Sequence, residues 1–203
     1  MVDADKTRQA LLEAAYEEIY RDGFQAASLS AILERTGVTK GALYHHFSSK
    51  LELGYAVVDE EISNKLHQLW IQPLQNEGNP IDILVATIEL AGQQITDKQL
   101  YLGCPLNNLA QEMSPIDAGF RMRIDQLYQQ WLKSIEHLIS KGQHSGKVKT
   151  SIDAADTALF IIASLEGCLG IAKNAQSHDE LERCGKGLIG YLNNLRAETS
   201  STY

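Results

Sequence analysis

The stretch "TGVTKGALYHHFSSK", from Thr36 to Lys50, differs in composition from the chain around it. It holds two lysines, two adjacent histidines, a tyrosine and several hydroxyl residues, and it contains no carboxylate. The 203-residue chain as a whole is acidic, with a formal net charge of -8 and a sequence pI ≈ 5.2. Residues 1–50 carry six Lys and Arg against seven Asp and Glu, so most of the negative charge lies later in the chain. The local composition therefore suits a polyanionic partner, although the overall charge does not.

Helical periodicity dominates the sequence around this stretch, and the alternation typical of β-strands is nearly absent. We therefore expect an all-α fold of about nine helices. The expected helices cover approximately residues 4–21, 29–35, 40–47, 50–70, 81–96, a short segment that begins at Pro105, 117–141, 153–175 and 179–196.

Within residues 29–47, two short helices flank a tight turn at Thr36-Gly37-Val38, which is the pattern of a helix-turn-helix. In such a motif the second helix lies in the major groove of DNA. Leu43 and Phe47, four residues apart, are expected to face inward. The outward or flanking residues have groups suited to DNA. Lys40, Tyr44 and Lys50 can donate to phosphate, and Thr39 supplies a hydroxyl. Gly41 lets the backbone approach closely, and the His45 imidazole can reach a base edge or a phosphate.

Two other interpretations of this segment compete with DNA binding. Lys, His and Tyr also occur on ordinary surface helices, and the pattern alone does not separate that reading from DNA binding. The paired histidines might suggest a metal site, but His45 and His46 are adjacent and point about 100° apart on a helix. They are therefore not expected to share one ion, and we expect neither a metal nor a cofactor.

The segment "SLSAILERTGVTKGALYHHFSSKLEL", together with the preceding helix and "DGF", resembles the DNA-binding signature of the tetracycline-repressor (TetR) family. The resemblance covers approximately residues 7–57. It implies an all-α homodimer with a helix-turn-helix domain at residues 1–50 and a ligand-binding and dimerisation domain at residues 51–203. It also implies repression of a two-fold symmetric DNA operator, relieved when a small molecule binds. By motif position, the implied DNA contacts are Ser28, Ser30, Thr39, Lys40, Gly41, Tyr44, His45 and Lys50.

The stretch "YLGCPLNNLAQEM", from Tyr101 to Met113, resembles a "GCPLGNLA"-like segment of one branch of that family. Cys104 lies just before an expected helix N-terminus, where the helix dipole would lower a thiol pKa. One hypothesis is that Cys104 senses an oxidant or electrophile. The other is that it is a small buried residue with a packing role. The residues that could contact a ligand are mostly aromatic, and they could equally belong to a plain core; they are Trp70, Tyr101, Cys104, Asn108, Phe120, Tyr128 and Trp131.

The expected helix at residues 153–175 is apolar almost all round, so it must be covered on both sides. A two-fold four-helix interface with the last helix would cover it, whereas a buried core within one chain is the alternative. The interface residues expected from the apolar positions of the two helices are Ile162, Leu165, Leu169, Leu188 and Leu192.

Composition and cysteine usage place the chain among soluble cytoplasmic proteins. There is no signal-peptide pattern, and the apolar run at residues 158–172 is interrupted by Glu166 and expected to be too short to span a bilayer. The three cysteines are odd in number and far apart, so we expect no disulfide framework, no CxxC metal motif and a reducing cytoplasm.

Two functions of other classes compete with that of a ligand-responsive repressor. An enzyme in the later helices lacks support, because no nucleophilic triad order, phosphate loop, HExxH or paired-carboxylate pattern is present. A nucleoid-type architectural DNA binder would be small and basic, whereas about three quarters of the length of this chain lies in an acidic domain. We therefore predict a DNA-binding regulator that is not an enzyme.

Overall fold

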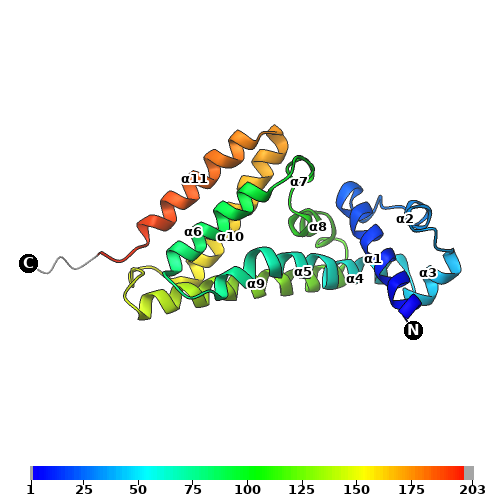
Figure 1. The fold of residues 1–203 in the computed structure, drawn as a ribbon, viewed down its shortest axis with the longest axis horizontal. Helices are drawn as coiled ribbons and strands as arrows, with labels where there is room; N and C mark the ends of the chain where they lie inside the picture. The colour runs from blue at the N-terminus through cyan, green and yellow to red at the C-terminus, as the bar shows by residue number, and fades with distance from the viewer. Residues whose placement is uncertain (1, 199–203) are drawn as a thin grey trace, which may run out of the picture. The chain divides into compact units, whose positions relative to one another are not determined.

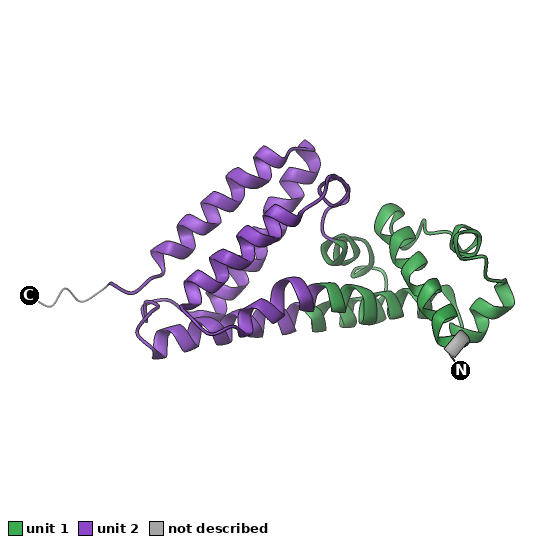
Figure 2. Ribbon diagram, in the orientation of Figure 1, with its two compact units in different colours: residues 1–65, 105–127 green, residues 66–104, 128–203 purple. Residues whose placement is uncertain are grey.

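A computed structural model describes residues 2–198, and nearly all of them lie in helices (Figure 1). The one β feature in that range is an isolated bridge between Val148 and Arg196. The chain forms two compact units, one of residues 1–65 and 105–127 and the other of residues 66–104 and 128–203 (Figure 2). The all-α expectation is confirmed, and each of the nine expected helices is present in the described residues.

The first unit begins with α1 (Val2–Asp22), α2 (Leu29–Thr36) and α3 (Lys40–His46). The apolar stripe of α1 supplies Leu11 and Leu12, and α3 supplies Leu43; all three side chains are fully buried. Helix α1 contacts both α2 and α3. Burial of these side chains stabilises helices that are too short to persist alone in water.

A long helical segment follows, made of α4 (Lys50–Ala56), the π-helical η1 (Val57–Ile62), α5 (Ser63–Leu66), the π-helical η2 (His67–Ile71) and the 3₁₀ turn η3 (Gln72–Gln75). It matches the single helix expected for residues 50–70. Ser49 caps its start, because its hydroxyl accepts a hydrogen bond from the backbone N–H of Glu52 (3.1 Å). The first unit holds the part of this segment up to Lys65.

The first unit also contains α8 (Pro105–Met113) and the beginning of α9 (Ala118–His144). Phe120 of α9 is fully buried, with its ring centroid 4.7 Å from that of Phe24 and 5.1 Å from that of Tyr55. Gly54 faces the Phe24 and Phe120 rings so closely that a Cβ atom there would collide with both. Helix α4 and the beginning of α9 are therefore held together around one aromatic cluster.

The second unit contains α6 (Pro80–Gln94), α7 (Asp97–Leu102), the remainder of α9, α10 (Ala154–Ala175) and α11 (His178–Asn194). Helix α11 contacts α6 and α10, and α10 contacts α7. The core is formed by the buried side chains of Trp131, Ile135 and Ile139 from α9, Ile161 from α10 and Leu192 from α11. Helix α7 was not predicted, although Thr96 and Gln99 form a capping box at its start.

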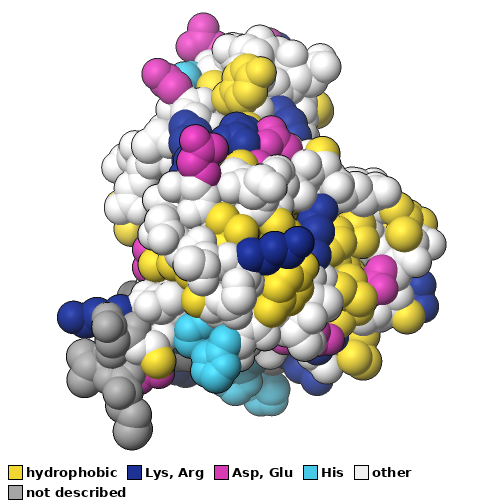
Figure 3. All heavy atoms as spheres, turned by 90° about the vertical axis from the view of Figure 1, so that its right-hand side faces the viewer, with side chains coloured by type: hydrophobic (Ala, Val, Ile, Leu, Met, Phe, Trp, Pro, Cys, Tyr) yellow, Lys and Arg dark blue, Asp and Glu magenta, His cyan; other side chains and the backbone are white. Residues whose placement is uncertain are grey.

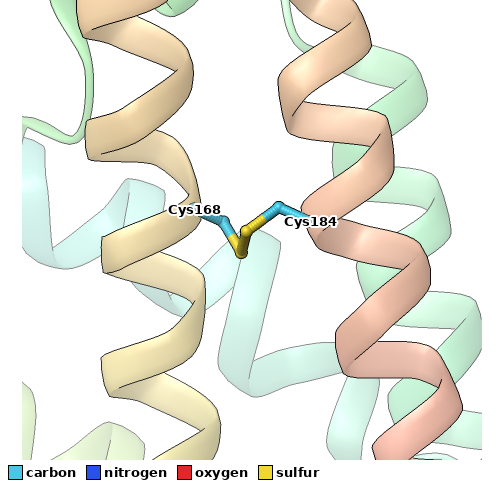
Figure 4. Close-up of a disulfide and its surroundings, with 2 residues drawn as sticks. All are labelled: Cys168 and Cys184. Carbon is cyan, nitrogen blue, oxygen red and sulfur yellow. A yellow bond between two sulfur atoms is a disulfide. The ribbon is translucent and has the colours of Figure 1, made fainter.

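Cys168 of α10 and Cys184 of α11 form a disulfide (Figure 4), with Cα atoms 5.5 Å apart. The expectation that the cysteines would form no disulfide was therefore wrong. The two helices are joined by a short turn at Gln176 and Ser177, so residues at equal distances from the turn face one another. The 16-residue separation of the two cysteines places both at such positions. Cys104 is not part of this bond.

Candidate functional site

Three local interactions fix helices α2 and α3 and the turn between them. The Ser28 hydroxyl accepts a hydrogen bond from the Ala31 N–H (3.3 Å) and caps α2, and the Thr39 hydroxyl accepts one from the Ala42 N–H (3.2 Å) and caps α3. Gly37 ends α2 with φ +67°, a left-handed conformation that favours glycine, while its N–H donates to the Leu33 carbonyl (2.9 Å). These caps hold α2 and α3 as a helix-turn-helix.

Helix α3 divides sharply into a buried and an exposed side. Leu43 and, just beyond the helix, Phe47 face the core of the unit, whereas the residues expected to contact DNA lie on the surface. Tyr44 is 42% exposed, which is unusual for a large aromatic side chain. No atom lies within 4 Å of the Cβ position at Gly41, so its backbone is open to close approach. The exposed residues of this region are Ser28, Ser30, Thr39, Lys40, Gly41, Tyr44 and His45.

The exposed side of α3 carries donors and rings rather than acids. The Lys40 ammonium lies 5.9 Å from the centroid of the Tyr44 ring, and the rings of His45 and His46 are 5.4 Å apart. Figure 3 looks at the molecule from the side on which α2 and α3 lie; histidine side chains gather near one edge of that face, and Lys and Arg side chains lie among hydrophobic ones. This surface can donate hydrogen bonds to phosphate oxygens and can present a ring to a base or sugar.

Lys50 is partly engaged within the chain. Its Nζ donates to the Gln25 carbonyl (3.0 Å) and lies 5.0 Å from the centroid of the Phe24 ring. An ammonium group has three donors, so two remain for a phosphate. The expected phosphate contact of Lys50 stays a prediction, and the structure adds that this lysine also holds the connection between α1 and α2.

Two carboxylates, for which the sequence predicts no such role, hold the same connection. Glu112 of α8 accepts hydrogen bonds from the backbone N–H groups of Phe24 (2.9 Å) and Gln25 (2.8 Å). Glu18 of α1 is buried and accepts hydrogen bonds from the Ser28 N–H (3.3 Å) and from the Arg21 guanidinium (2.6 Å). Both positions are ordinary in sequence, because a helical glutamate carries no signal of which distant backbone group it will meet.

A further contact joins the start of α9 to α4 within the first unit. The Tyr55 hydroxyl donates to Asp117 (2.8 Å), and the same carboxylate accepts from the Phe120 N–H (2.8 Å). The Phe120 N–H and the Tyr55 hydroxyl lower the pKa of Asp117, and the hydrogen bond to Asp117 raises the pKa of Tyr55. Carboxylate contacts, as well as apolar packing, thus hold α8 and the beginning of α9 within the first unit.

The residues predicted to contact a ligand separate into three places. Trp70, Cys104, Tyr128 and Trp131 belong to the second unit, where the Trp70 and Trp131 ring centroids are 5.3 Å apart. Tyr101 is also in this unit but is 64% exposed. Asn108 and Phe120 belong to the first unit, and Phe120 is fully buried in the aromatic cluster with Phe24 and Tyr55.

Glu166 of α10 joins the group in the second unit. Cys104 Sγ donates to Glu166 Oε1 (3.3 Å), and burial raises the pKa of Glu166 to about 7. Burial and the nearby Glu166 and Cys104 raise the pKa of Tyr128. The sequence offered one signal for Glu166, since it is the acidic residue that interrupts an apolar run. Among the described residues, no group of three or more His, Cys, Asp or Glu side chains has the geometry to hold a metal ion.

The predicted dimer-interface residues do not lie on one free surface. Ile162 is 4% exposed, Leu188 and Leu192 are also buried within the unit of one chain, and Leu165 and Leu169 are half-buried. The exposed apolar residues of α10 are instead Leu159, Phe160 and Ile171. The structure therefore corrects which face is free, because both faces of α10 are apolar and periodicity alone does not distinguish them.

Helix α10 has a second property that departs from expectation. Among the described residues it is the one helix long and apolar enough to cross a membrane, judged by length and composition alone, because it extends beyond the apolar run at residues 158–172. In the structure, 28% of its most apolar window is buried inside the chain. Much of α10 therefore presents apolar surface that needs a partner.

Comparison with known proteins identifies the family to which this architecture belongs. Residues 11–57 match the family described as bacterial regulatory proteins, tetR family, and residues 80–188 match the tetracyclin repressor-like, C-terminal domain. The chain belongs to the TetR family. The TetR relatives include an uncharacterised HTH-type transcriptional regulator from Lactococcus lactis, 31% identical over 176 residues that cover 87% of this chain and 88% of the relative.

Further TetR relatives agree in sequence and in fold. The HTH-type transcriptional repressor DhaR of Mycobacterium sp. is 26% identical and covers 87% of each chain. The crystal structure of a TetR regulator from Chloroflexus aurantiacus superimposes with a TM-score of 0.88 at 26% identity, over 98% of this chain and 100% of the other. The chain is therefore a DNA-binding transcriptional regulator, and its family consists of regulators rather than enzymes.

Proposed function

We propose that this TetR protein is a cytoplasmic, homodimeric repressor that leaves a two-fold symmetric operator when a small molecule binds in its second unit. The observation that carries the proposal is the exposed side of α3, where Lys40, Gly41, Tyr44 and His45 lie together without a carboxylate. Lys40, Tyr44 and Lys50 bind phosphate and fix the register, while His45 and the open backbone at Gly41 approach the base edges. Ser28, Ser30 and Thr39 add hydroxyl or backbone N–H contacts to phosphate at the helix starts.

The proposed dimer forms through the exposed apolar faces of α10 and α11. Phe160 of α10 is 51% exposed and stacks edge-on against Tyr191 of α11, with ring centroids 4.8 Å apart. At Gly167, Gly170, Gly187 and Gly190 no atom lies within 4 Å of the Cβ position, so a partner helix can approach these backbones closely. Two copies of this hairpin would make a four-helix interface and cover surface that is otherwise apolar and exposed.

Helix α8 can transmit the effect of ligand binding to the DNA-binding helices. It begins at Pro105, directly after Cys104, and its Glu112 holds the backbone of Phe24 and Gln25 before α2. A ligand that displaces Cys104 would shift α8 and, through Glu112, the start of α2. The ligand must bind the non-DNA state more tightly, because only a difference in affinity shifts the equilibrium.

The function is tested by selecting binding sites for the purified protein from a pool of random-sequence duplexes. The proposal predicts enrichment of an inverted repeat with half-site centres about 34–36 Å apart, one turn of the duplex, or a multiple of that distance. Enrichment of single, unrelated half-sites, or of no sequence at all, would contradict a dimeric operator-binding repressor. Transcription from a promoter that carries the selected site then separates repression from activation.

A further inference from the structure

Two polar atoms in the second unit are buried without a hydrogen-bond partner among the described residues: Nε1 of Trp131 and Oε2 of Glu166. Trp131 is 2% exposed, and its indole N–H is a donor. Unpartnered buried polar atoms are rare in folded proteins, and each one requires an explanation. A bound molecule that pairs with both atoms would provide one.

The two atoms belong to one connected group of side chains. Cys104 Sγ occupies the other carboxyl oxygen of Glu166 (3.3 Å), so Oε2 is the oxygen left for a ligand. Burial and the nearby Glu166 and Cys104 raise the pKa of Tyr128, so its phenol lies in the neighbourhood of both groups. Tyr128 precedes Trp131 by three residues on α9, which places both rings on one helical face. The Trp131 ring in turn contacts the Trp70 ring. We refer to Trp70, Cys104, Tyr128, Trp131 and Glu166 as the aromatic–carboxyl cluster.

We propose that the aromatic–carboxyl cluster binds an organic cation, namely a protonated amine on an apolar or aromatic body. The ammonium group would donate to Glu166 Oε2, and the rings of Tyr128, Trp131 and Trp70 would surround the apolar body. This inference rests on the proposed function, because it assigns the chemical class of the effector.

A cation satisfies the cluster better than a neutral or an acidic molecule does. An ammonium group supplies a hydrogen-bond donor for Oε2 together with the counter-charge that a buried carboxylate lacks. Among the described residues, no Lys, Arg or His forms an ion pair with Glu166. Aromatic faces attract cations, whereas an alcohol gains only a single hydrogen bond and an acid would be repelled. The Trp131 N–H remains for an acceptor on the same molecule.

Protonation of Glu166 gives this binding a distinctive signature. Burial raises the pKa of Glu166 to about 7, and the titratable groups that face it are the Cys104 thiol and the Tyr128 phenol, whose own pKa is raised. At pH 6 the free carboxyl is mainly protonated, whereas an adjacent ammonium favours the ionised form. Binding of an amine at pH 6 therefore releases nearly one proton for each molecule bound, and binding of a neutral alcohol releases none.

The test uses phenoxyalkylamines from 2-phenoxyethylamine to 4-phenoxybutylamine, whose ether oxygen can accept a hydrogen bond from the Trp131 N–H. Each amine is compared with its alcohol and carboxylate counterparts of the same shape. The chain has two tryptophans, and both lie in the cluster, so intrinsic tryptophan fluorescence reports on the site directly. At pH 8, where Glu166 is ionised, we expect at least one amine of the series to bind tenfold or more tightly than its alcohol, with the carboxylate weakest. Calorimetry at pH 6 in two buffers of different ionisation enthalpy measures the released proton.

The variant Glu166→Gln keeps the shape of the side chain and removes its charge. It should lose at least tenfold in amine affinity and should lose the proton release, while alcohol binding is retained. Glu89→Gln, at an exposed position of α6 in the same unit, should behave as the unchanged protein. Circular dichroism confirms that both variants are folded.

Three results would overturn the inference: equal binding of amines and alcohols, undiminished amine binding by Glu166→Gln, or no binding of any amine in the series. Operator release is measured in parallel with the same compounds. Amine binding that depends on Glu166 but leaves the operator complex intact would support the cation site and contradict effector-controlled release. The failure of the proposed function is thus distinguishable from the failure of the cation site.

Discussion

Three glutamates show how the same residue type takes different roles in this TetR protein. Glu18 and Glu112 are ion-paired or hydrogen-bonded to backbone N–H groups and hold the entry to α2, whereas Glu166 keeps one buried oxygen without a partner. The first two contacts organise the DNA-binding unit. The third is an unsatisfied group of the kind that a binding site retains.

Replacement of Glu112 by Ala should destabilise the first unit and weaken operator binding. The substitution leaves two backbone N–H groups without their charged acceptor, for which we expect a loss of about 1–3 kcal/mol in the free energy of unfolding. Urea denaturation measures this loss. Gln111→Ala, at the preceding exposed position of α8, is the control and should change stability by less than about 0.5 kcal/mol. Equal stability of the two variants would exclude a structural role for the Glu112 carboxylate.

Glu166 should make stability depend on pH in a direction opposite to that of a salt-bridged acid. Its folded pKa of about 7 lies above the ordinary value of 4.5, so the folded state holds a proton that the unfolded state has lost between those two values. Stability therefore falls as pH rises from about 4.5 to 7, by up to about 3 kcal/mol. Denaturation of the unchanged protein and of Glu166→Gln at pH 5, 6, 7 and 8 should show the variant gaining relative stability as pH rises. If the difference in unfolding free energy between the two proteins stayed constant with pH, the raised pKa of Glu166 would be contradicted.

At the scale of the helices, most of the fold is predictable from the sequence because each helix carries its own start, stop and apolar stripe. Ser28, Thr39 and Ser49 cap the helices at the positions where the sequence predicted that helices begin. Helix α7 was missed because it is short, although its capping box is visible at Thr96 and Gln99. The π-helical segments η1 and η2 have no comparable signal, because no cap or stop residue separates them from the α-helical turns on either side.

The candidate sites were predictable to different degrees for a related reason. A short motif fixed by local caps places Lys40 and Tyr44 on the exposed side of α3 without knowledge of the rest of the chain. The disulfide, the position of Phe120 and the partner of Glu166 all depend on which helices pack together. The apolar faces of α10 are alike in sequence, so the choice of buried face likewise required tertiary structure.

Two glycines on helices test the packing of each unit. Gly54→Ala should destabilise the protein by about 1–3 kcal/mol, because its Cβ would meet the Phe24 and Phe120 rings. Gly92→Ala, in α6 with open space around it, should instead stabilise by up to about 1 kcal/mol through higher helix propensity. Thermal or urea denaturation gives both values. If both variants lost stability, close packing around Gly54 would not explain the destabilisation by Gly54→Ala.

At the scale of the whole molecule, the proposed repressor requires two copies of the chain that each present an α3 to the operator. A monomer would leave the exposed apolar residues of α10 uncovered and would read one half-site with much lower affinity. The proposed dimer would therefore cover this apolar surface and bring two copies of α3 to the operator together.

Phe160→Glu should convert the protein to a folded monomer, because it places a charge in the proposed α10–α11 interface without altering the core of the unit. Sedimentation velocity measures the change in mass, and circular dichroism confirms the fold. Leu90→Glu is the matched control, since Leu90 is a similarly exposed apolar residue on α6 outside the proposed surface. A dimer that persists in Phe160→Glu would place the interface elsewhere.

The central claim, that α3 is the DNA-reading helix, is tested most directly by anisotropy titrations of the selected operator at several salt concentrations. Lys40→Ala should weaken binding about tenfold. It should also reduce the slope of log K against log salt concentration by about one for each lysine lost from a half-site. Lys133→Ala, which removes an exposed lysine of α9, should leave both affinity and slope unchanged. If Lys40→Ala matched Lys133→Ala in affinity and in slope, α3 would not be the element that contacts DNA.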